Sequence, residues 1–219
     1  ARGHIVILST VRLARPVSDV KVVHDWVIQA ALAGEPVRPV LWAQPAPSLL
    51  LVRHDRGLAV TDFPPKAVDS VTHRPYWLPA VGQRVDWAVI VDAAQSGQTT
   101  GQWRTRNAVN AAAGRGVRDA PKPRRIRTPG QMVEVVTGRL APVMDVTGAD
   151  PAWHRPRKGL RGREGRVMWS NQVLVRGAGR VTDEPGLQGL MREGIGRGRS
   201  FGCGLLLARP ATGDGGAAW

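Results

Sequence analysis

Few side chains in this sequence could transfer a proton near neutral pH. The five histidines are the first candidates for general acid–base catalysis, because the unperturbed pKa of histidine lies close to neutrality. Their spacing does not resemble a metal-ligand cluster. His24 falls in a segment with apolar residues at helical spacing, one helical turn after Lys21. By pattern alone, such a histidine is more often a partly packed surface residue. The histidines are His4, His24, His54, His73 and His154.

A glycine-rich, basic loop is the second chemically distinctive stretch. Glycine adopts positive φ without strain and lets a partner approach the backbone, so glycines beside arginines predict close contact with a polyanion. A dinucleotide-binding turn needs a strand before its glycines and a helix after them. Here a helix-like segment, Glu184 to Arg192, comes first and an apolar strand follows. The residues predicted to contact the polyanion are Gly194, Gly196, Arg197, Arg199, Gly202 and Gly204.

The spacing of this loop, Gly-apolar-Gly, five residues, Gly-apolar-Gly, resembles the signature of the CRISPR repeat-processing endoribonucleases. The string from Gly194 to Leu207 is most similar to the CasE branch, the crRNA-processing subunit of the type I-E Cascade complex. The resemblance implies an endoribonuclease that needs no metal or other cofactor. It would cut precursor CRISPR RNA at the base of the repeat hairpin, leave a 2′,3′-cyclic phosphate and a 5′-hydroxyl, and retain the crRNA. Its partners would be the repeat hairpin RNA and the other Cascade subunits.

The resemblance also selects the proton-transfer residue, because the family carries its catalytic histidine shortly after the first strand, where His24 lies. RNA supplies its own nucleophile, the 2′-hydroxyl, so a base, an acid and a nearby cation are sufficient. CasE-like enzymes often have a tyrosine three residues before the histidine, where this chain has Lys21. Lys21 could stabilise developing negative charge, or it could be a solvated surface lysine. The only tyrosine is Tyr76.

The charge of the chain agrees with a nucleic-acid partner. Its 31 Lys and Arg residues against 17 Asp and Glu residues give a net charge of +14, which attracts phosphate backbones. Residues 1–80 carry +3 and residues 81–219 carry +11, so the second part is expected to hold most of the RNA contacts. A generally arginine-rich proteome is the alternative explanation of the charge.

Two basic tracts are candidates for binding the RNA stem. The first lies in a Gly- and Pro-punctuated segment that predicts a protruding hairpin loop, and the family resemblance implies that a basic element from this region engages the stem. Clustered cations suit A-form RNA, which is recognised mainly through shape and backbone. Trp153, beside this tract, is a candidate nucleic-acid contact. The second tract, between Arg115 and Arg127, could equally be a solvated loop. The first tract comprises Arg155, Arg157, Lys158, Arg161 and Arg163.

The single cysteine, Cys203, excludes an internal disulfide framework and a multi-cysteine zinc site. No apolar run is long enough to span a bilayer, and no signal peptide is expected before His4. These features predict a cytoplasmic protein with no membrane partner.

The order of predicted elements passes twice through strand, helix, strand, strand, helix, strand, which is the βαββαβ pattern of a ferredoxin-like domain. We therefore predict an α+β protein with two tandem ferredoxin-like domains, residues 1–80 and 81–219, the first carrying the catalytic helix. Residues 94–127 are expected to form a mobile insertion.

The individual elements follow from hydrophobic periodicity and turn residues. In the first domain we expect a strand at His4–Leu13, a helix at Val17–Ala33 that Ser18 or Asp19 caps and Gly34 ends, and a hairpin of Leu49–Arg53 with Leu58–Thr61. A remaining helix and strand would fall within Pro64–Trp77. In the second domain we expect strands at Arg84–Val91, Pro142–Thr147 and Cys203–Ala208, a strand or hairpin at Val167–Arg180, and helices at Pro129–Leu140 (begun by Thr128) and Glu184–Arg192.

Two functions from different classes fit these observations. The preferred one is the metal-independent endoribonuclease. The other is a subunit that binds structured RNA, or scaffolds a ribonucleoprotein, without cutting it, which the missing tyrosine would allow. A nucleotide-dependent enzyme is disfavoured by the order of elements around the glycines and by the absence of a phosphate-loop lysine motif.

Overall fold

The computed structural model describes residues 6–32, 40–94, 108–114, 127–161, 166–196 and 198–211. Its strands form two four-stranded antiparallel sheets, with the orders β2-β3-β1-β4 and β6-β7-β5-β8. The first sheet contains β1 (Ile7–Leu13), β2 (Leu41–Ala46), β3 (Leu49–His54) and β4 (Val68–Pro75). The second contains β5 (Arg84–Asp92), β6 (Met144–Arg161), β7 (Arg166–Val181) and β8 (Leu206–Pro210).

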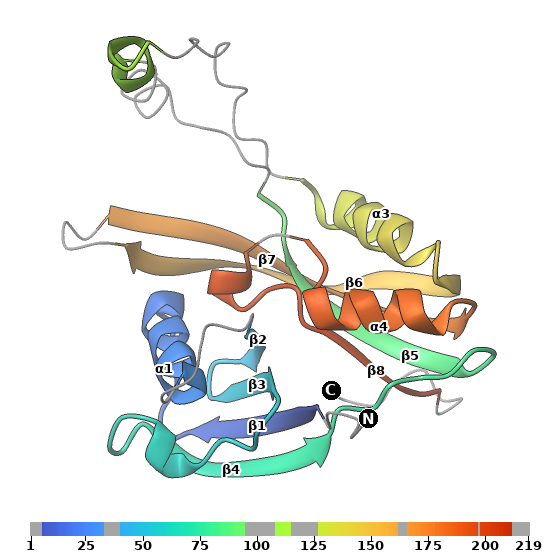
Figure 1. Ribbon diagram of the computed structural model, residues 1–219, viewed down its shortest axis with the longest axis horizontal. Helices are drawn as coiled ribbons and strands as arrows, with labels where there is room; N and C mark the ends of the chain where they lie inside the picture. The colour runs from blue at the N-terminus through green and yellow to red at the C-terminus, as the bar shows by residue number, and fades with distance from the viewer. Residues whose placement is uncertain are drawn as a thin grey trace.

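Counted within its own sheet, each set of strands has the same order, second-third-first-fourth. That is the order expected of a ferredoxin-like βαββαβ unit. The predicted α+β fold with two such units is confirmed. Three long helices accompany the sheets: α1 (Val20–Leu32) beside the first, and α3 (Pro129–Leu140) and α4 (Glu184–Glu193) beside the second (Figure 1).

Helix α1 forms because its apolar residues recur at helical spacing and pack against the first sheet. Val20, Val23 and Val27 are fully buried. The carboxylate of Asp19 caps the helix, accepting hydrogen bonds from the backbone N–H groups of Lys21 (2.8 Å) and Val22 (3.4 Å). Of the two predicted caps, Asp19 is the one used, and the helix begins three residues later than expected. Gly34 lies outside the described residues.

The predicted start of α3 is confirmed in detail. The hydroxyl of Thr128 accepts from the N–H of Gln131 at 3.3 Å, and the Gln131 side chain accepts from the N–H of Thr128 at 3.0 Å, which makes a capping box. The carboxylate of Asp183 caps α4 in the same way, at 3.2 Å from the N–H of Gly186. Both helices bury apolar faces in the core of the second sheet.

The predicted hairpin in the first unit is wrong. The partners of β3 are β2 and β1, and residues 60–62 form a short 3₁₀ turn in place of a strand. Strand β2 was missed because Pro45 and Pro47 interrupt its pattern. No α-helix lies between β3 and β4, within residues 40–94, all of which are described. The prolines at positions 64 and 65 oppose a helix there, so the second helix expected in this unit is absent.

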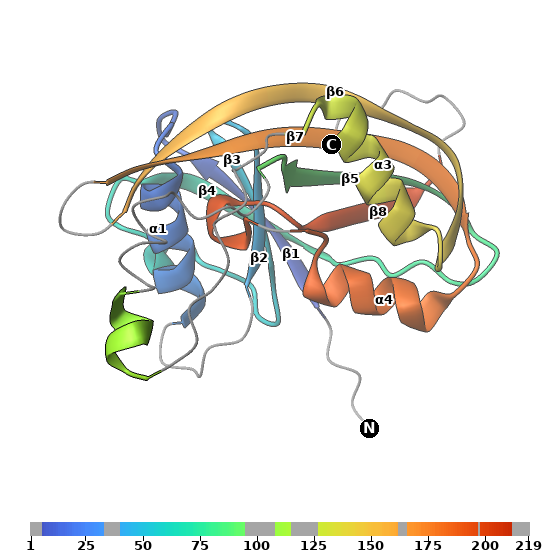
Figure 2. The same ribbon diagram turned by 90° about the horizontal axis from the view of Figure 1, so that it is seen from above.

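Strands β6 and β7 form one long hairpin, with 18 and 16 residues. Seen from above, the hairpin arches from the second sheet across to α1 (Figure 2). Four residues of the first basic tract therefore lie along β6, where a loop was expected: Arg155, Arg157, Lys158 and Arg161. The final strand starts at Leu206, later than the predicted Cys203, because the backbone at Gly202 and Gly204 has positive φ and cannot continue a strand.

The two sheets share one core. Leu8, Leu41 and Leu51 of the first sheet belong to the same buried cluster as Trp87 and the other inward residues of the second. The alternate residues of the same strands face α1 in a smaller cluster. Strands β1, β2 and β3 of the first sheet are therefore buried on both faces, whereas the edge strand β4 is mostly exposed. The insertion predicted at 94–127 lies largely outside the described residues; within it, residues 108–112 are helical.

Candidate functional site

His24 lies in the second turn of α1, four residues after Val20. Helix α1 contacts both β6 and the 3₁₀ turn Arg199–Phe201 of the glycine loop. The three segments meet at Gly159 of β6, where an added Cβ would lie 3.0 Å from Val20 Cγ2 and 3.3 Å from Phe201 Cε1. The structure thus brings the predicted histidine helix, the basic strand and the glycine loop together.

The imidazole of His24 is half-buried, and its pKa is lowered. Burial is the largest cause, because it disfavours the charged form. Lys21 lowers the pKa further, while Asp25 opposes the shift and raises it. A histidine with a lowered pKa is neutral at pH 7, which is the form that can accept a proton. Its Nδ1 is buried and has no hydrogen-bond partner among the described residues.

Lys21 pairs with a carboxylate on its own helix. Its ammonium forms a salt bridge with Asp25, one turn further along α1. Both side chains are substantially exposed, at 38% and 57%. Exposed pairs of this kind are worth little, so a stronger anion such as a phosphate could displace Asp25. The prediction that Lys21 stabilises charge at the reacting phosphate is untested by this arrangement.

A protruding hairpin loop would leave the basic side chains of the first tract exposed, and for Arg157 that expectation is wrong. Arg157 is 6% exposed. Its guanidinium donates to the side chain of Gln44 and, at 3.3 Å, to the carbonyl oxygen of Val17. Arg155 also turns inward and donates to the backbone carbonyl of Gln44. Lys158 points the other way and is exposed.

These opposite orientations follow from the geometry of a strand, in which successive side chains point to opposite faces. Arg155, Arg157 and Gly159 face the first sheet and α1, whereas Lys158 faces away. The side chain of Arg161 and all of Arg163 lie outside the described residues. Of the tract, Lys158 is the cation whose described position suits RNA binding.

The glycine loop adopts the backbone that its composition predicts. Gly194, Gly196, Gly198, Gly202 and Gly204 all have φ between +72° and +93°, a region that favours glycine. Their surroundings differ, however.

Gly202 and Gly204 are buried against the protein itself. A Cβ at Gly202 would lie 2.5 Å from Cζ3 of Trp42, and one at Gly204 would lie 3.1 Å from the carbonyl oxygen of Ile195. Gly194 is similarly crowded, by the carbonyl oxygen of Gly204 at 2.9 Å. These three glycines are therefore required by the fold. Gly196 is exposed, and the nearest atom to its Cβ position is 3.8 Å away. Arg199 is exposed, and Arg197 lies outside the described residues.

Tyr76 and Trp153 have structural partners. The hydroxyl of Tyr76 donates to the carbonyl of Leu206, between the two sheets, and burial raises its pKa well above the usual range. The ring of Trp153 is half-buried and is covered by the guanidinium of Arg155, 4.1 Å from the ring centroid. The predicted contact of Trp153 with nucleic acid would have to displace this arginine.

The sequence matches the family model described as "CRISPR associated protein" over residues 6–210. The chain belongs to this CRISPR-associated family. The family resemblance seen in the glycine loop is thereby confirmed. A search of curated protein sequences found no significant match.

Several solved structures share the fold of this CRISPR-associated protein. Cse3 of Thermus thermophilus, bound to an RNA representing a pre-cleavage complex, has a TM-score of 0.67 and 19% identity, covering 94% of this chain and 100% of that chain. Cas6e of Escherichia coli K-12 has a TM-score of 0.62 and 18% identity, with coverage of 94% and 100%. A chain of E. coli Cascade bound to a PAM-containing double-stranded DNA target has a TM-score of 0.52 and 15% identity, with coverage of 93% and 99%.

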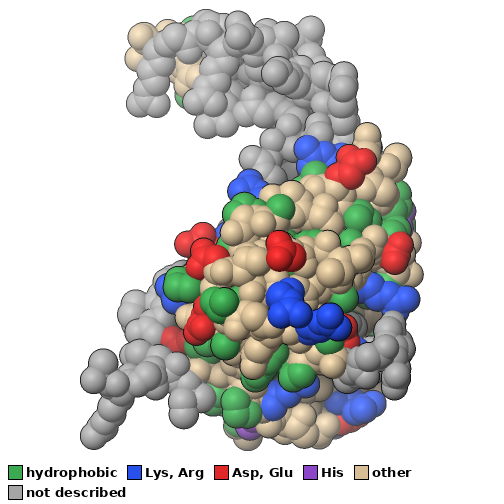
Figure 3. Space-filling view, turned by 90° about the vertical axis from the view of Figure 1, so that its right-hand side faces the viewer, with side chains coloured by type: hydrophobic (Ala, Val, Ile, Leu, Met, Phe, Trp, Pro, Cys, Tyr) green, Lys and Arg blue, Asp and Glu red, His purple; other side chains and the backbone are tan. Residues whose placement is uncertain are grey.

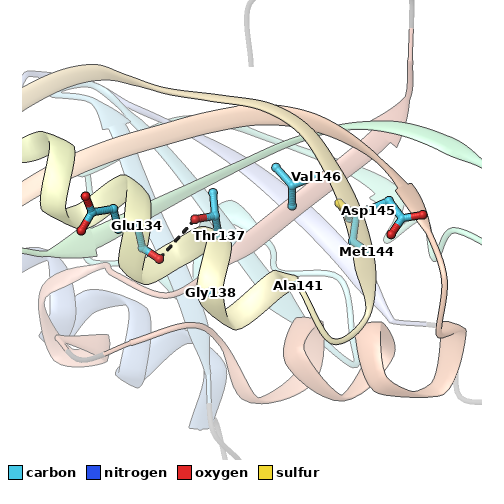
Figure 4. Close-up of a pocket in the computed structure, with 7 residues that line it drawn as sticks. All are labelled: Glu134, Thr137, Gly138, Ala141, Met144, Asp145 and Val146. Carbon is cyan, nitrogen blue, oxygen red and sulfur yellow. Dashed lines mark hydrogen bonds between the residues drawn. The ribbon is translucent and has the colours of Figure 1, made fainter.

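A shallow groove lies at the far end of β6 from α1, between α3 and the start of β6. Two acidic side chains that line it, Glu134 and Asp145, sit apart from each other (Figure 4). Among the described residues, no group of three His, Cys, Asp or Glu side chains could hold a metal ion. None of the described helices is long and apolar enough to cross a membrane.

The face at this same end of this CRISPR-associated protein carries interspersed acidic and basic side chains (Figure 3). Neither sign forms a continuous patch there, so this face offers no obvious track for a phosphate backbone.

Proposed function

We propose that this protein is a metal-independent endoribonuclease that cuts precursor CRISPR RNA at the base of the repeat hairpin and retains the crRNA for Cascade assembly. The observation that carries the proposal is the half-buried His24, with its lowered pKa, on the helix that contacts both β6 and the 3₁₀ turn of the glycine loop. The similar protein Cse3 is named an endoribonuclease and was solved with RNA, which supports the same class of substrate.

The reaction needs only groups that the RNA and this site supply. The 2′-oxygen forms a bond to phosphorus, the bond from phosphorus to the 5′-oxygen breaks, and a 2′,3′-cyclic phosphate and a 5′-hydroxyl result. Neutral His24 accepts the proton of the 2′-hydroxyl, and the imidazolium so formed can return a proton to the 5′-oxygen. Lys21, released from Asp25, would stabilise the extra negative charge on the phosphate oxygens.

The remaining cations would hold the RNA. Lys158 and Arg161 of β6, together with Arg163, which follows β6 in the sequence, would contact stem phosphates. Arg197 and Arg199 belong to the glycine loop, and its open member Gly196 leaves room for a phosphate to approach the backbone. In this proposal Arg155 and Arg157 support the hairpin from its inner face. The protein would act in the cytoplasm with the other Cascade subunits.

Incubation of the purified protein with a repeat-hairpin RNA in EDTA tests the proposal, since a metal-independent enzyme cuts under these conditions. His24→Ala should lower the cleavage rate by about 10²–10⁴-fold, because that is the usual contribution of proton transfer. Its affinity for an RNA with a 2′-deoxy group at the scissile nucleotide should stay within a few-fold of the parent protein. His154→Ala, at an exposed histidine of β6, is the matched control and should cut like the parent. Equal loss of binding and cutting in His24→Ala would make His24 structural.

A non-cleaving RNA-binding subunit is the second candidate, and one observation favours it. The Nδ1 of His24 has no partner among the described residues, and Lys21 is engaged with Asp25, so no described group orients the imidazole. Tight binding with fully intact RNA in the same incubation would establish this function and overturn the first.

A further inference from the structure

A buried polar cluster joins the hairpin to the chain that leads into α1. At its centre is Gln44 of β2, which is 1% exposed. Its Nε2 donates to the carbonyl oxygens of Val17 and Pro47, each at 2.9 Å. Its Oε1 accepts a hydrogen bond from Arg157, and its backbone carbonyl accepts one from Arg155. One glutamine therefore ties both sheets to the segment before the helix.

Arg157 closes the cluster from the hairpin side. It donates to the Val17 carbonyl as well as to Gln44, so two side chains from different sheets hold the same carbonyl group. Burial lowers the pKa of Arg157 to about 10, with Arg155 acting in the same direction, and the guanidinium stays charged at neutral pH. Hydrogen bonds from a charged donor are stronger than neutral ones, which makes the junction stiff.

The carbonyl held in this way lies three residues before α1 begins. Two residues beyond Arg157, Gly159 packs directly on the first turn of the helix, with its Cβ position 3.0 Å from Val20 Cγ2 and 3.4 Å from the backbone nitrogen of Lys21. His24 follows Val20 by about one turn. The place of His24 relative to the hairpin is therefore decided at this junction.

We propose that Gln44 and Arg157 are positioning residues: they hold α1 against β6 and so place His24 relative to RNA bound on the hairpin. This rests on the proposed endoribonuclease function. A purely structural role would lower stability and leave the reaction of folded protein unchanged. Loss of a positioning residue would lower the cleavage rate of the protein–RNA complex, while the protein stays folded and still binds RNA.

The test is Gln44→Ala, with Gln29→Ala, at an exposed glutamine of α1, as the matched control. We expect the single-turnover rate at saturating RNA to fall by about 10–100-fold, since a displacement of about 1 Å at a reacting group can cost 10²-fold. Affinity for the 2′-deoxy RNA should remain within a few-fold of the parent protein, and Gln29→Ala should match the parent in both. Arg157→Lys, which keeps a buried hydrogen-bond donor, should lower the single-turnover cleavage rate less than Arg157→Ala does.

Amide hydrogen exchange supplies a readout that does not need activity. In Gln44→Ala, exchange should rise together in residues 15–24 and in residues 152–160, under conditions where the whole protein stays folded. A parent-like rate with a lowered melting temperature would overturn the positioning role. So would faster exchange in only one of the two segments, or an equal loss of rate and affinity. Intact RNA with the parent protein would instead overturn the proposed function itself, before any variant is compared.

Discussion

The two faces of the outer part of β6 both carry cationic side chains, but these side chains have different environments. Arg155 and Arg157 turn toward the first sheet, where they donate to Gln44. Lys158, between Arg157 and the glycine that touches α1, is exposed. Consecutive cations along a strand therefore divide into two sets, because alternate side chains point to opposite faces of the sheet. One set holds the protein together, and the other is available to a phosphate backbone.

The glycine loop shows the same division. Gly202 is pressed against Trp42 inside the protein, whereas Gly196 opens to solvent. Both need a positive φ, so both are glycine for one shared reason. Only the inner glycine is also required by packing. Substitutions at matched inner and outer positions measure how strongly the two kinds of position differ.

Gly202→Val should be the most damaging change. A side chain there must adopt a positive φ, which costs about 1–3 kcal/mol, and must also displace Trp42, which costs about another 1–3 kcal/mol. Gly196→Val should carry only the first of these costs. Urea unfolding of the two variants gives both values, with Arg199→Ala, at an exposed position, as the control close to the parent protein. Equal destabilisation by the two valines would show that packing does not distinguish the glycines.

Arg157→Ala should destabilise the protein by about 1–3 kcal/mol, because it leaves the buried acceptor on Gln44 without its donor. Lys158→Ala, one residue away, should change the free energy of unfolding by less than about 0.5 kcal/mol, as surface substitutions usually do. Thermal or urea unfolding checks the difference. If Lys158→Ala were as destabilising as Arg157→Ala, the two faces of β6 would not differ in their structural role.

RNA affinity should show the reverse ranking. Lys158→Ala should reduce the slope of log affinity against log salt by about 0.7–0.9 for each phosphate that Lys158 neutralises. Arg157→Lys keeps the buried charge and should leave the slope unchanged. Fluorescence anisotropy with a labelled, uncleavable hairpin across a salt series measures both slopes. An unchanged slope in Lys158→Ala would remove the outer face from the RNA interface.

The smallest effects are expected in the pH dependence of cleavage, which reports on the half-buried His24. Its pKa is lowered below 6.5, so the neutral base predominates at pH 6.5 and above, and the cleavage rate should fall as the pH drops through the lowered pKa. Asp25→Asn removes a group that raises the pKa, and should move this acid limb to still lower pH. Lys21→Ala removes a group that lowers the pKa, and should move the limb upward. Single-turnover cleavage rates between pH 4.5 and 8 measure where the rate falls at low pH. If the rate fell at the same pH in all three proteins, the assignment of His24 as the base would be contradicted.

Much of the fold could be predicted from local patterns. Helices α1, α3 and α4 and strand β5 have regular periodicity, and the three helices also have recognisable caps. The predicted bounds of these four elements agree with the structure to within a few residues. Strand β2 could not be found this way because its prolines resemble a turn. Gln44 was missed for a related reason. A glutamine after the apolar run Leu41-Trp42-Ala43 is a sign of a buried hydrogen-bonding side chain, but two of its partners, Val17 and Arg157, lie 27 and 113 residues away.

Local sequence patterns were enough to predict the family, the tandem α+β architecture, the histidine on the first long helix and the glycines with positive φ. Each of these depends on residues close together in the chain, whose spacing is visible directly. Only the tertiary structure decided which cations and which glycines face inward. Arg157 is buried because the side chain of Gln44 in the other sheet and the carbonyl of Val17 before α1 accept hydrogen bonds from its guanidinium. Gly202 is crowded because Trp42 of β2 lies against it. The environment of a side chain depends on the element packed against it, and a local pattern does not contain that element.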